Sequence, residues 1–317
     1  MCDFTGSESW VVLSSIEQSI KRKIESVGTP LKDWDINIYR GVLTGYNEAF
    51  IISTEKRDVI LANCHDEEER KRTEELIRPI LRGRDIKRYG YEWAQIYLIS
   101  TFPARHYDID MYPAVKDYLL SFAYDYLMET GNEWVAEQYL AEYCRQKLDQ
   151  TGKEIIIKGR YVLDQQGHKE KSRKKTSNKW FETQDSISYW EDFSKQKIIY
   201  REIGFEMDAT IIPEGWFVNN KLYLITGDSI EYLITLLNSK LFNKILLASA
   251  NLTGGKGVDF MEKLCLPNDE SLSAALTSIY RTRLSNPDFE KRIDLKLYDF
   301  YKLSNAEIEF LEKESGE

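Results

Sequence analysis

The sequence has few of the residues that hold metals, form disulfides or build nucleophilic catalytic sets. It contains 4 cysteines and 3 histidines among 317 residues. No two cysteines form a CxxC pair, and each histidine stands alone; the cysteines are Cys2, Cys64, Cys144 and Cys265. This spacing predicts neither a zinc site nor a disulfide framework, and it is typical of a reducing cytoplasm. We therefore expect a cytoplasmic chain with no metal site and no catalytic residues of its own.

Long apolar runs are also missing. No run of about 18 apolar residues occurs anywhere, as a membrane-spanning helix would need. The N-terminal region contains no apolar stretch of the kind found in secretory signal peptides. We therefore expect a protein that is neither inserted in a membrane nor secreted by a classical signal.

The chain has fewer basic than acidic residues: 43 lysines and arginines against 52 aspartates and glutamates, which gives a net charge of −9. This balance argues mildly against a nucleic-acid partner, because phosphate binding needs positive charge. The cations nevertheless gather in Arg82 to Arg88 and Lys169 to Lys179, whereas acids concentrate in Asp66 to Glu75 and the C-terminal tail. This segregation favours a DNA-binding face on an otherwise acidic body.

Aromatic residues are abundant, at 13% of the chain with 20 tyrosines. Tyrosine suits interfaces because its ring buries area while its hydroxyl keeps a polar partner. A tyrosine-rich core explains the same composition equally well, so both interpretations stay open.

The hydrophobic pattern predicts an α+β fold with a mixed sheet, because strands and helices do not alternate as in a doubly wound protein. We expect a hairpin over Ile36 to Ser53, strands at Ile96 to Ile99, KIIYREI and WFVNNKLYLIT, and a core helix over Ile230 to Leu247. Further helices are expected at Trp10 to Glu25, Asp66 to Arg78, from Tyr112 onward, Trp134 to Lys147, and throughout the tail from Leu272 to Glu314. Gln165 to Lys179 breaks all periodicity and is expected to be a long loop or a disordered insertion.

Three motifs that imitate catalytic sites fail on inspection. Asn286-Pro287-Asp288-Phe289 lies one residue from the base-holding signature of amino-methyltransferases, but no buried strand or glycine-rich cofactor loop precedes it. Asp288, Asp294 and Lys296 imitate a nuclease site, yet the acids are expected on the solvated surface of a helix. Gly254-Gly255-Lys256-Gly257 lacks the upstream glycine and the following Ser/Thr of a phosphate-binding loop.

The segment YRGVLTGYNEAFII is similar to the G-x-x-T-G-x-N-x-A-F signature of the TaqI-like C-terminal specificity domain. Further blocks agree in order: PILRGRDIKRY, YPAVKDYL, KIIYREI, EYLITLLNSKLF and the closing IDLKLYDFYKLSNAEIEFLEK. The resemblance extends over about Trp34 to Lys313. The family forms the target-recognition part of type IIG restriction-modification enzymes and of related adenine-specific DNA methyltransferases.

The resemblance implies a bacterial defence role in which this chain reads DNA and does not catalyse. We expect a linker helix over residues 1–33, a target-recognition domain over 34–267, and a helical tail over 268–317 that packs on that domain. The partners would be double-stranded DNA and a methyltransferase domain or subunit. S-adenosylmethionine and Mg²⁺ would bind to the parent enzyme or partner, and this chain would bind no cofactor. The chain would be either a fragment of a longer enzyme or a separately encoded specificity subunit. The alternative is a protein-interaction module that docks on a methyltransferase and contacts DNA little.

DNA recognition requires Arg, Lys, Asn or Gln at groove edges and cations on phosphates. A short loop holds Arg82, Arg84, Lys87 and Arg88, where a guanidinium could be oriented for guanine; a solvated charge cluster is the alternative. The cations of the polar segment lack rigid neighbours and suit phosphates; they are Lys169, Lys171, Arg173, Lys174, Lys175 and Lys179. Lys256 is a further candidate in a glycine-rich connection. Thr44 and Asn47 could be presented by the expected hairpin turn, although we favour a role in the turn itself.

Overall fold

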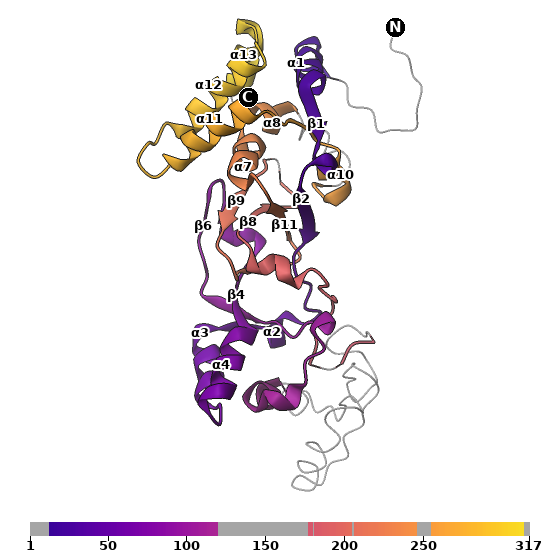
Figure 1. The fold of residues 1–317 in the computed structure, drawn as a ribbon, viewed down its shortest axis with the longest axis vertical. Coiled ribbons are helices and arrows are strands. Elements are labelled where there is room, and N and C mark those ends of the chain that lie inside the picture. Colours follow the sequence, from indigo (N-terminus) through magenta and orange to yellow (C-terminus); the bar gives the residue numbers. More distant parts are fainter. Residues whose placement is uncertain (1–12, 120–176, 180, 205, 246–254, 314–317) are drawn as a thin grey trace, which may run out of the picture.

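The structure is a computed structural model that describes residues 13–119, 177–179, 181–204, 206–245 and 255–313. A four-stranded antiparallel sheet in the order β2-β11-β8-β9 lies between two hydrophobic cores (Figure 1). Its strands are β2 (Ile36–Arg40), β8 (Lys197–Arg201), β9 (Thr210–Ile212) and β11 (Leu222–Gly227). We name the cores the upper core and the lower core after their places in Figure 1.

The central sheet has no solvent face over most of its length. Tyr200 and Tyr223 point into the upper core, whereas Ile199, Leu222 and Leu224 belong to the lower core. Successive side chains of a strand point to opposite faces of the sheet. A sheet that is buried on both faces therefore needs apolar residues at consecutive positions. This explains why Ile198 to Tyr200 and Leu222 to Ile225 are continuous apolar runs and not alternating ones.

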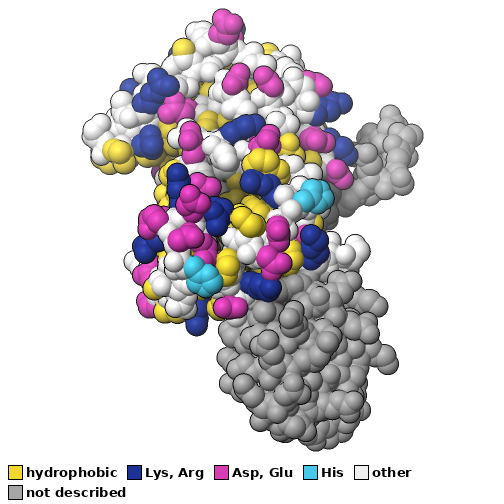
Figure 2. All heavy atoms as spheres, turned by 60° about the horizontal axis from the view of Figure 1, so that its bottom comes forward, with side chains coloured by type: hydrophobic (Ala, Val, Ile, Leu, Met, Phe, Trp, Pro, Cys, Tyr) yellow, Lys and Arg dark blue, Asp and Glu magenta, His cyan; other side chains and the backbone are white. Residues whose placement is uncertain are grey.

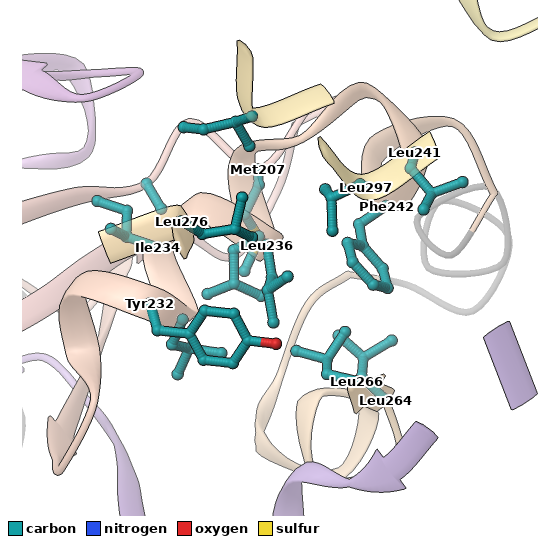
Figure 3. Packing of buried hydrophobic residues seen from close by; sticks show 14 of the residues in the cluster. Met207, Tyr232, Ile234, Leu236, Leu241, Phe242, Leu264, Leu266, Leu276 and Leu297 are labelled. Atoms are coloured by element: carbon teal, nitrogen blue, oxygen red, sulfur yellow. The ribbon is translucent and has the colours of Figure 1, made fainter. Parts of the chain in front are cut away.

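The upper core lies between the sheet and a layer of helices. It is built by α1 (Ser15–Val27), α7 (Ile230–Asn238), α8 (Lys240–Ile245), α10 (Val258–Glu262), α11 (Glu270–Arg281), α12 (Phe289–Phe300), α13 (Asn305–Glu312) and the pair β1 (Gly28–Pro30) and β12 (Cys265–Pro267). Leu236, Leu276 and Leu297 meet within it (Figure 3). The hydroxyl of Tyr232 donates to the carbonyl of Pro267 at 2.6 Å, which satisfies the polar end of a buried ring.

The lower core is built on a mixed sheet in the order β10-β4-β7-β3. The strands are β3 (Ile51–Ser53), β4 (Ile77–Leu81), β7 (Ile96–Ile99) and β10 (Phe217–Val218). The helices α2 (Asn47–Phe50), α3 (Thr54–Ala62), α4 (Glu67–Leu76) and residues 113–119 surround it, and a small hairpin of β5 (Ile86–Lys87) and β6 (Gly90–Tyr91) projects toward the tail.

The expected hairpin over Ile36 to Ser53 is wrong. β2 pairs with β11 of the central sheet, and β3 pairs with β7 of the lower sheet. The segment between them passes from one sheet to the other and forms the single helical turn α2. Apolar periodicity predicts a strand but does not identify the strand that pairs with it. Here β2 and β3 pair with strands of two different sheets and not with each other.

The core position of the segment Ile230 to Leu247 is confirmed over its described part, where Leu233, Leu237 and Leu241 are at most 3% exposed. The prediction of one continuous helix is wrong, because the helix ends at Asn238 and a second helix starts at Lys240. Ser239 adopts an extended conformation at the break, and its hydroxyl accepts from Phe242 N–H at 3.3 Å. Serine at such a position competes with the helix and caps the next one.

The helical tail is confirmed as α11, α12 and α13, and Asn286 to Asp288 forms the turn that joins the first two. The expectation that Asp294 is solvated is wrong, since it is 2% exposed. Its carboxylate accepts from the Lys240 N–H at 3.0 Å, at the start of α8. Burial raises the pKa of Asp294 to about 6.

The N-terminal helix is confirmed with a later start. α1 begins after Ser14, which forms a reciprocal capping box with Glu17. α4 ends at Leu76, two residues before the expected end. The expected helix at Trp134 to Lys147 and most of the polar segment Gln165 to Lys179 lie outside the described residues. None of the helices in the described part of the chain is long and apolar enough to cross a membrane.

Candidate nucleic-acid interface

Three segments that are far apart in the sequence meet at one edge of the two sheets. Asn219, in the turn between β10 and β11, donates its N–H to the carbonyl of Leu81 at the end of β4. Asn220 donates to the carbonyl of Val42, at 2.9 Å. A Cβ on Gly41 would lie 2.2 Å from the carbonyl oxygen of Asn219, so only glycine permits this approach.

The following residues of the signature segment also act as scaffold. The Thr44 hydroxyl, on a side chain that is 1% exposed, donates to Asn47 Oδ1 at 2.7 Å and accepts from Tyr46 N–H at 3.2 Å. Gly45 has a φ of 79°, a conformation that glycine adopts without strain. These contacts agree with the favoured interpretation that Thr44 and Asn47 serve the turn. Thr44 is not presented to solvent, whereas Asn47 is exposed.

The short loop that follows β4 separates its two arginines. Arg82 grips the buried carboxylate of Asp85 through Nε at 3.0 Å and Nη2 at 2.9 Å, while its N–H donates to the same carboxylate at 2.8 Å. Arg84 at the tip is exposed and makes no hydrogen bond or ion pair within the described residues. Arg82 therefore holds the loop, and Arg84 keeps its five donors for a ligand.

Lys87 and Arg88, the next two cations of the loop, both form ion pairs but differ in exposure. Lys87 is exposed and pairs with Glu92 across the β5–β6 hairpin. Arg88 forms an ion pair with Glu290 of α12 at 2.7 Å and lies beside Tyr89, whose ring packs edge-on against Phe289 at 5.0 Å. Arg88 thus joins the hairpin to the tail, and Lys87 remains on the surface.

Two cations that the sequence analysis missed lie at the turn between β10 and β11, which contacts the segment that leads into the loop of Arg84. Lys221 Cβ is 3.4 Å from the position of a Cβ on Gly83, and Lys221 is exposed. Arg40 Nε donates to the carbonyl of Asn220 at 3.1 Å, and Arg40 faces Glu202 at 3.9 Å on a half-exposed surface. We name Arg40, Arg84 and Lys221 the basic ledge. No local pattern joins residues about 180 positions apart, so only pairing between the strands could reveal it.

The ledge rests on a rigid support from the central sheet. Arg201, on β8, donates from Nε to the carbonyl of Gly83 at 2.7 Å and from Nη2 to the carbonyl of Ile86. Its Nη1 pairs with Asp208 at 2.7 Å. The loop that carries Arg84 is therefore bonded at both ends to a buried strand, as an oriented guanidinium requires.

The remaining sequence-derived candidates lie elsewhere. Lys256 is 1% exposed and donates from Nζ to the carbonyls of Gly204 at 2.8 Å and Glu206 at 2.7 Å. Burial lowers its pKa to about 8, so the structure uses Lys256 inside the fold and not on a surface. Lys179 is exposed, with its Nζ 5.6 Å from the centroid of the Phe181 ring. Lys169, Lys171, Arg173, Lys174 and Lys175 fall outside the described residues.

Charged side chains of both signs are mixed on the described face of the lower end that Figure 2 draws. Figure 2 shows lysine and arginine side chains interspersed with acidic ones around exposed hydrophobic groups. Within the described ranges, no group of three or more His, Cys, Asp or Glu side chains could hold a metal ion. The basic ledge offers hydrogen-bond donors that suit phosphates or base edges.

A family model matches part of the chain. Residues 149–256 match the TaqI-like C-terminal specificity domain. This range contains β8 to β11, α7 and α8, and with them the blocks KIIYREI and EYLITLLNSKLF. The signature segment, the Arg82 to Arg88 loop and the tail helices lie outside the match, which is narrower than the resemblance over Trp34 to Lys313. A comparison with curated protein sequences gives no match.

Two solved structures resemble this chain. One is the type IIL restriction-modification enzyme MmeI in complex with DNA, with 12% identity and a TM-score of 0.46 over 89% of this chain and 35% of that chain. The other is the type IIG restriction endonuclease BpuSI, with 15% identity and a TM-score of 0.44 over 84% of this chain and 28% of that chain. The chain thus spans about a third of the length of these enzymes.

Proposed function

We propose that this chain is the sequence-specific DNA-recognition module of a restriction-modification system of the type IIG kind, because residues 149–256 match the model of the TaqI-like C-terminal specificity domain. The family match is the single observation that carries the proposal. The matched segment includes Arg201 of β8, which holds the loop that carries Arg84, and Lys221 of the ledge itself, just before β11.

The ledge supplies the two kinds of contact that recognition needs. Arg84 has an unoccupied guanidinium on a loop whose ends are bonded to β8, so it suits a bidentate contact with a guanine edge. Lys221, which lies beside Gly83, and Arg40, which donates to Asn220, suit phosphates, which fix the register of the duplex without reading it. Thr44 and Lys256 are buried and are not part of the proposed contact surface.

The module would act for a partner that carries out the chemistry. We propose that it positions a methyltransferase domain or subunit on its site, and a nuclease where the system has one. S-adenosylmethionine and Mg²⁺ would then bind to that partner. Methylation of a base requires that it leave the stack, so a separate surface must hold the duplex while the base is flipped.

Selection from a randomised duplex library tests the proposal directly. The purified chain, or its complex with a partner, is incubated with the library at low salt, and the bound fraction is sequenced over several rounds. We expect enrichment of one short asymmetric sequence, and a much weaker enrichment for Arg84→Ala.

Arg22→Ala is the matched control, because Arg22 is an exposed arginine on α1 without a hydrogen bond or ion pair in the described part of the chain. Binding without any enriched sequence would refute sequence reading. Failure to retain any duplex would favour the alternative of a module that docks on a protein partner.

A further inference from the structure

A cavity of about 230 Å³ in the lower half of the molecule contains a surplus of positive charge. Arg72 of α4, Arg78 of β4 and Arg105 line it, and among the described residues Glu75 is the only acidic side chain in its wall. Aromatic and polar groups complete the lining: Tyr107, Tyr112, Trp190, Phe193, Ser100 and Ser194. Three guanidiniums around one cavity are unusual in a chain whose net charge is −9.

The three arginines have few partners that would neutralise them. Arg105 lies over the Trp190 ring, with Cζ 3.8 Å from the centroid, and makes no ion pair within the described residues. Arg78 Nε donates to the carbonyl of Gly215 at 3.3 Å and likewise has no carboxylate partner there. Arg72 forms one ion pair in the described part of the chain, with Glu68 at 3.8 Å on a carboxylate that is 90% exposed, and its Nη2 donates to the carbonyl of Met111 at 3.4 Å.

The cavity is also built to hold these side chains in place. A Cβ on Gly215 would lie 2.0 Å from Arg78 Nη2, so the glycine, with a φ of 75°, makes room for the guanidinium. Arg72 Nε is buried and has no hydrogen-bond partner. A buried donor without an acceptor costs free energy unless a ligand or water satisfies it. The arrangement therefore lacks an acceptor with negative charge.

We propose that this cavity is a binding site for a phosphate group, either of a phosphorylated small molecule or of a nucleic-acid backbone. Guanidinium donors match phosphate oxygens in bidentate geometry, and three of them balance a dianion even with Glu75 nearby. The volume lies below the range of about 300–1,000 Å³ that encloses drug-sized ligands, so it suits the phosphate and not a whole nucleotide. The cavity lies near Arg78 and Gly215, whereas the basic ledge lies beyond Leu81 and Asn219 at the opposite ends of β4 and β10. The site therefore stands independently of the function proposed above.

Equilibrium dialysis with radiolabelled inorganic phosphate tests the site, at constant ionic strength set with chloride. We expect saturable binding to the full chain and roughly tenfold or greater weakening in Arg105→Gln and in Arg72→Gln, since each removes a charge-assisted hydrogen bond. Lys71→Gln is the control because it removes one charge from the exposed face of the same helix, outside the cavity. Arg105 is exposed, so its replacement leaves the core intact.

Competition separates the two sources of phosphate. Displacement of the label by a nucleoside monophosphate, but not by a duplex of equal phosphate concentration, assigns the site to small phosphorylated molecules. Displacement by the duplex at lower concentration assigns it to the nucleic-acid backbone. Absence of saturable binding, or equal affinity in the wild-type chain and both cavity variants, would overturn the proposal.

Discussion

Some cations in this chain are bonded to other groups within the fold, and others are exposed to solvent. Arg82 is bound to Asp85, Arg88 to Glu290, and Lys256 to two backbone carbonyls. Arg84 and Lys221 are exposed without such partners in the described part of the chain. Two arginines separated by one residue thus have opposite roles, because one points at a buried carboxylate and the other at the tip of the loop.

Substitution of the two loop arginines should distinguish these roles. Arg84→Ala should leave the free energy of unfolding within about 0.5 kcal/mol and weaken binding to the selected DNA site by about 1–3 kcal/mol, with little change on scrambled duplexes. Arg82→Ala should lower stability by roughly 1–3 kcal/mol, since the buried Asp85 loses its charged partner. Denaturant unfolding and duplex titrations measure both effects. Equal losses of affinity on both duplexes for Arg84→Ala would reduce Arg84 to a phosphate contact.

The break between α7 and α8 shows how capping and burial determine where a helix ends. The segment that begins at Ile230 is apolar enough for one long helix, yet it divides at Ser239 so that α8 can turn against α12 and α13. Asp294 of α12 accepts from the first N–H of α8 and so supports the break from outside. A buried acid thus does the work that a capping residue of the same helix would normally do.

The two leucine positions Leu237 and Leu284 test how much α7 contributes to the core. Leu237→Ala should cost about 2–5 kcal/mol of unfolding free energy, because Leu237 is 3% exposed within the upper core. Leu284→Ala is the control, since Leu284 is 94% exposed and should change stability by less than about 0.5 kcal/mol. Similar small effects at both positions, measured by chemical denaturation, would contradict the packing of α7.

The buried Asp294 should make stability depend on pH in a defined direction. Burial raises its pKa to about 6, above its ordinary value, so the folded state binds the proton more tightly than the unfolded state. Its stabilising contribution is therefore complete below the unfolded pKa of about 4 and is lost as the pH rises through 6.

Asp294→Asn keeps an acceptor for the Lys240 N–H and removes this loss. The variant should gain stability over the wild type progressively from about pH 4 to pH 6, by roughly 2–3 kcal/mol in total, since one pKa unit corresponds to about 1.4 kcal/mol. Unfolding curves at several pH values measure the difference. Asp288→Asn, on an exposed residue at the start of the same helix, should show no such trend.

The whole molecule consists of two cores that share one sheet, with α1 and the tail packed together on the upper one (Figure 1). Lys23 of α1 binds Glu307 of α13 at 2.6 Å, so the two ends of the described chain support each other. At this scale the sequence adds a second group of cations, in the polar segment from Gln165 to Lys179.

The cations of that segment should act together and without sequence preference. Replacing Lys169, Lys171, Arg173, Lys174, Lys175 and Lys179 by glutamine should weaken all duplexes alike and flatten the dependence of affinity on salt, because fewer counterions are released. Titrations at several salt concentrations on selected and scrambled duplexes measure this. An unchanged salt slope would remove the segment from the interface.

The isolated chain should neither methylate nor cut DNA. We expect this because the sequence holds no cofactor loop and no base-holding motif, and because Asp294, the candidate metal ligand, is buried and bonded to α8. Incubation with plasmid, S-adenosylmethionine and Mg²⁺ is the measurement. Methyl transfer or cleavage that is abolished by changing Asn286 or Asp288 would show that the catalytic motifs were dismissed wrongly.

Local signals determined much of this protein. Apolar periodicity and turn residues predicted the strand at Ile96 to Ile99, the core position of Leu233 and Leu237, and the helical tail. These features depend on residues within a few positions of each other, where the backbone geometry is nearly the same in every protein. The resemblance to a specificity domain was carried by the sequence in the same way, through short ordered blocks.

Tertiary structure alone decided strand partners and the fate of each polar side chain. The apolar runs around Ile38 and Ile52 marked two strands correctly, but their partners β11 and β7 were set by which faces the two cores could bury together. Long-range packing decides which of Arg82 and Arg84 stays free and whether Lys256 reaches solvent. It also decides that Arg40 lies at the turn that precedes Lys221. Those contacts join residues distant in sequence, and their free energies come from burial and geometry that no local pattern contains.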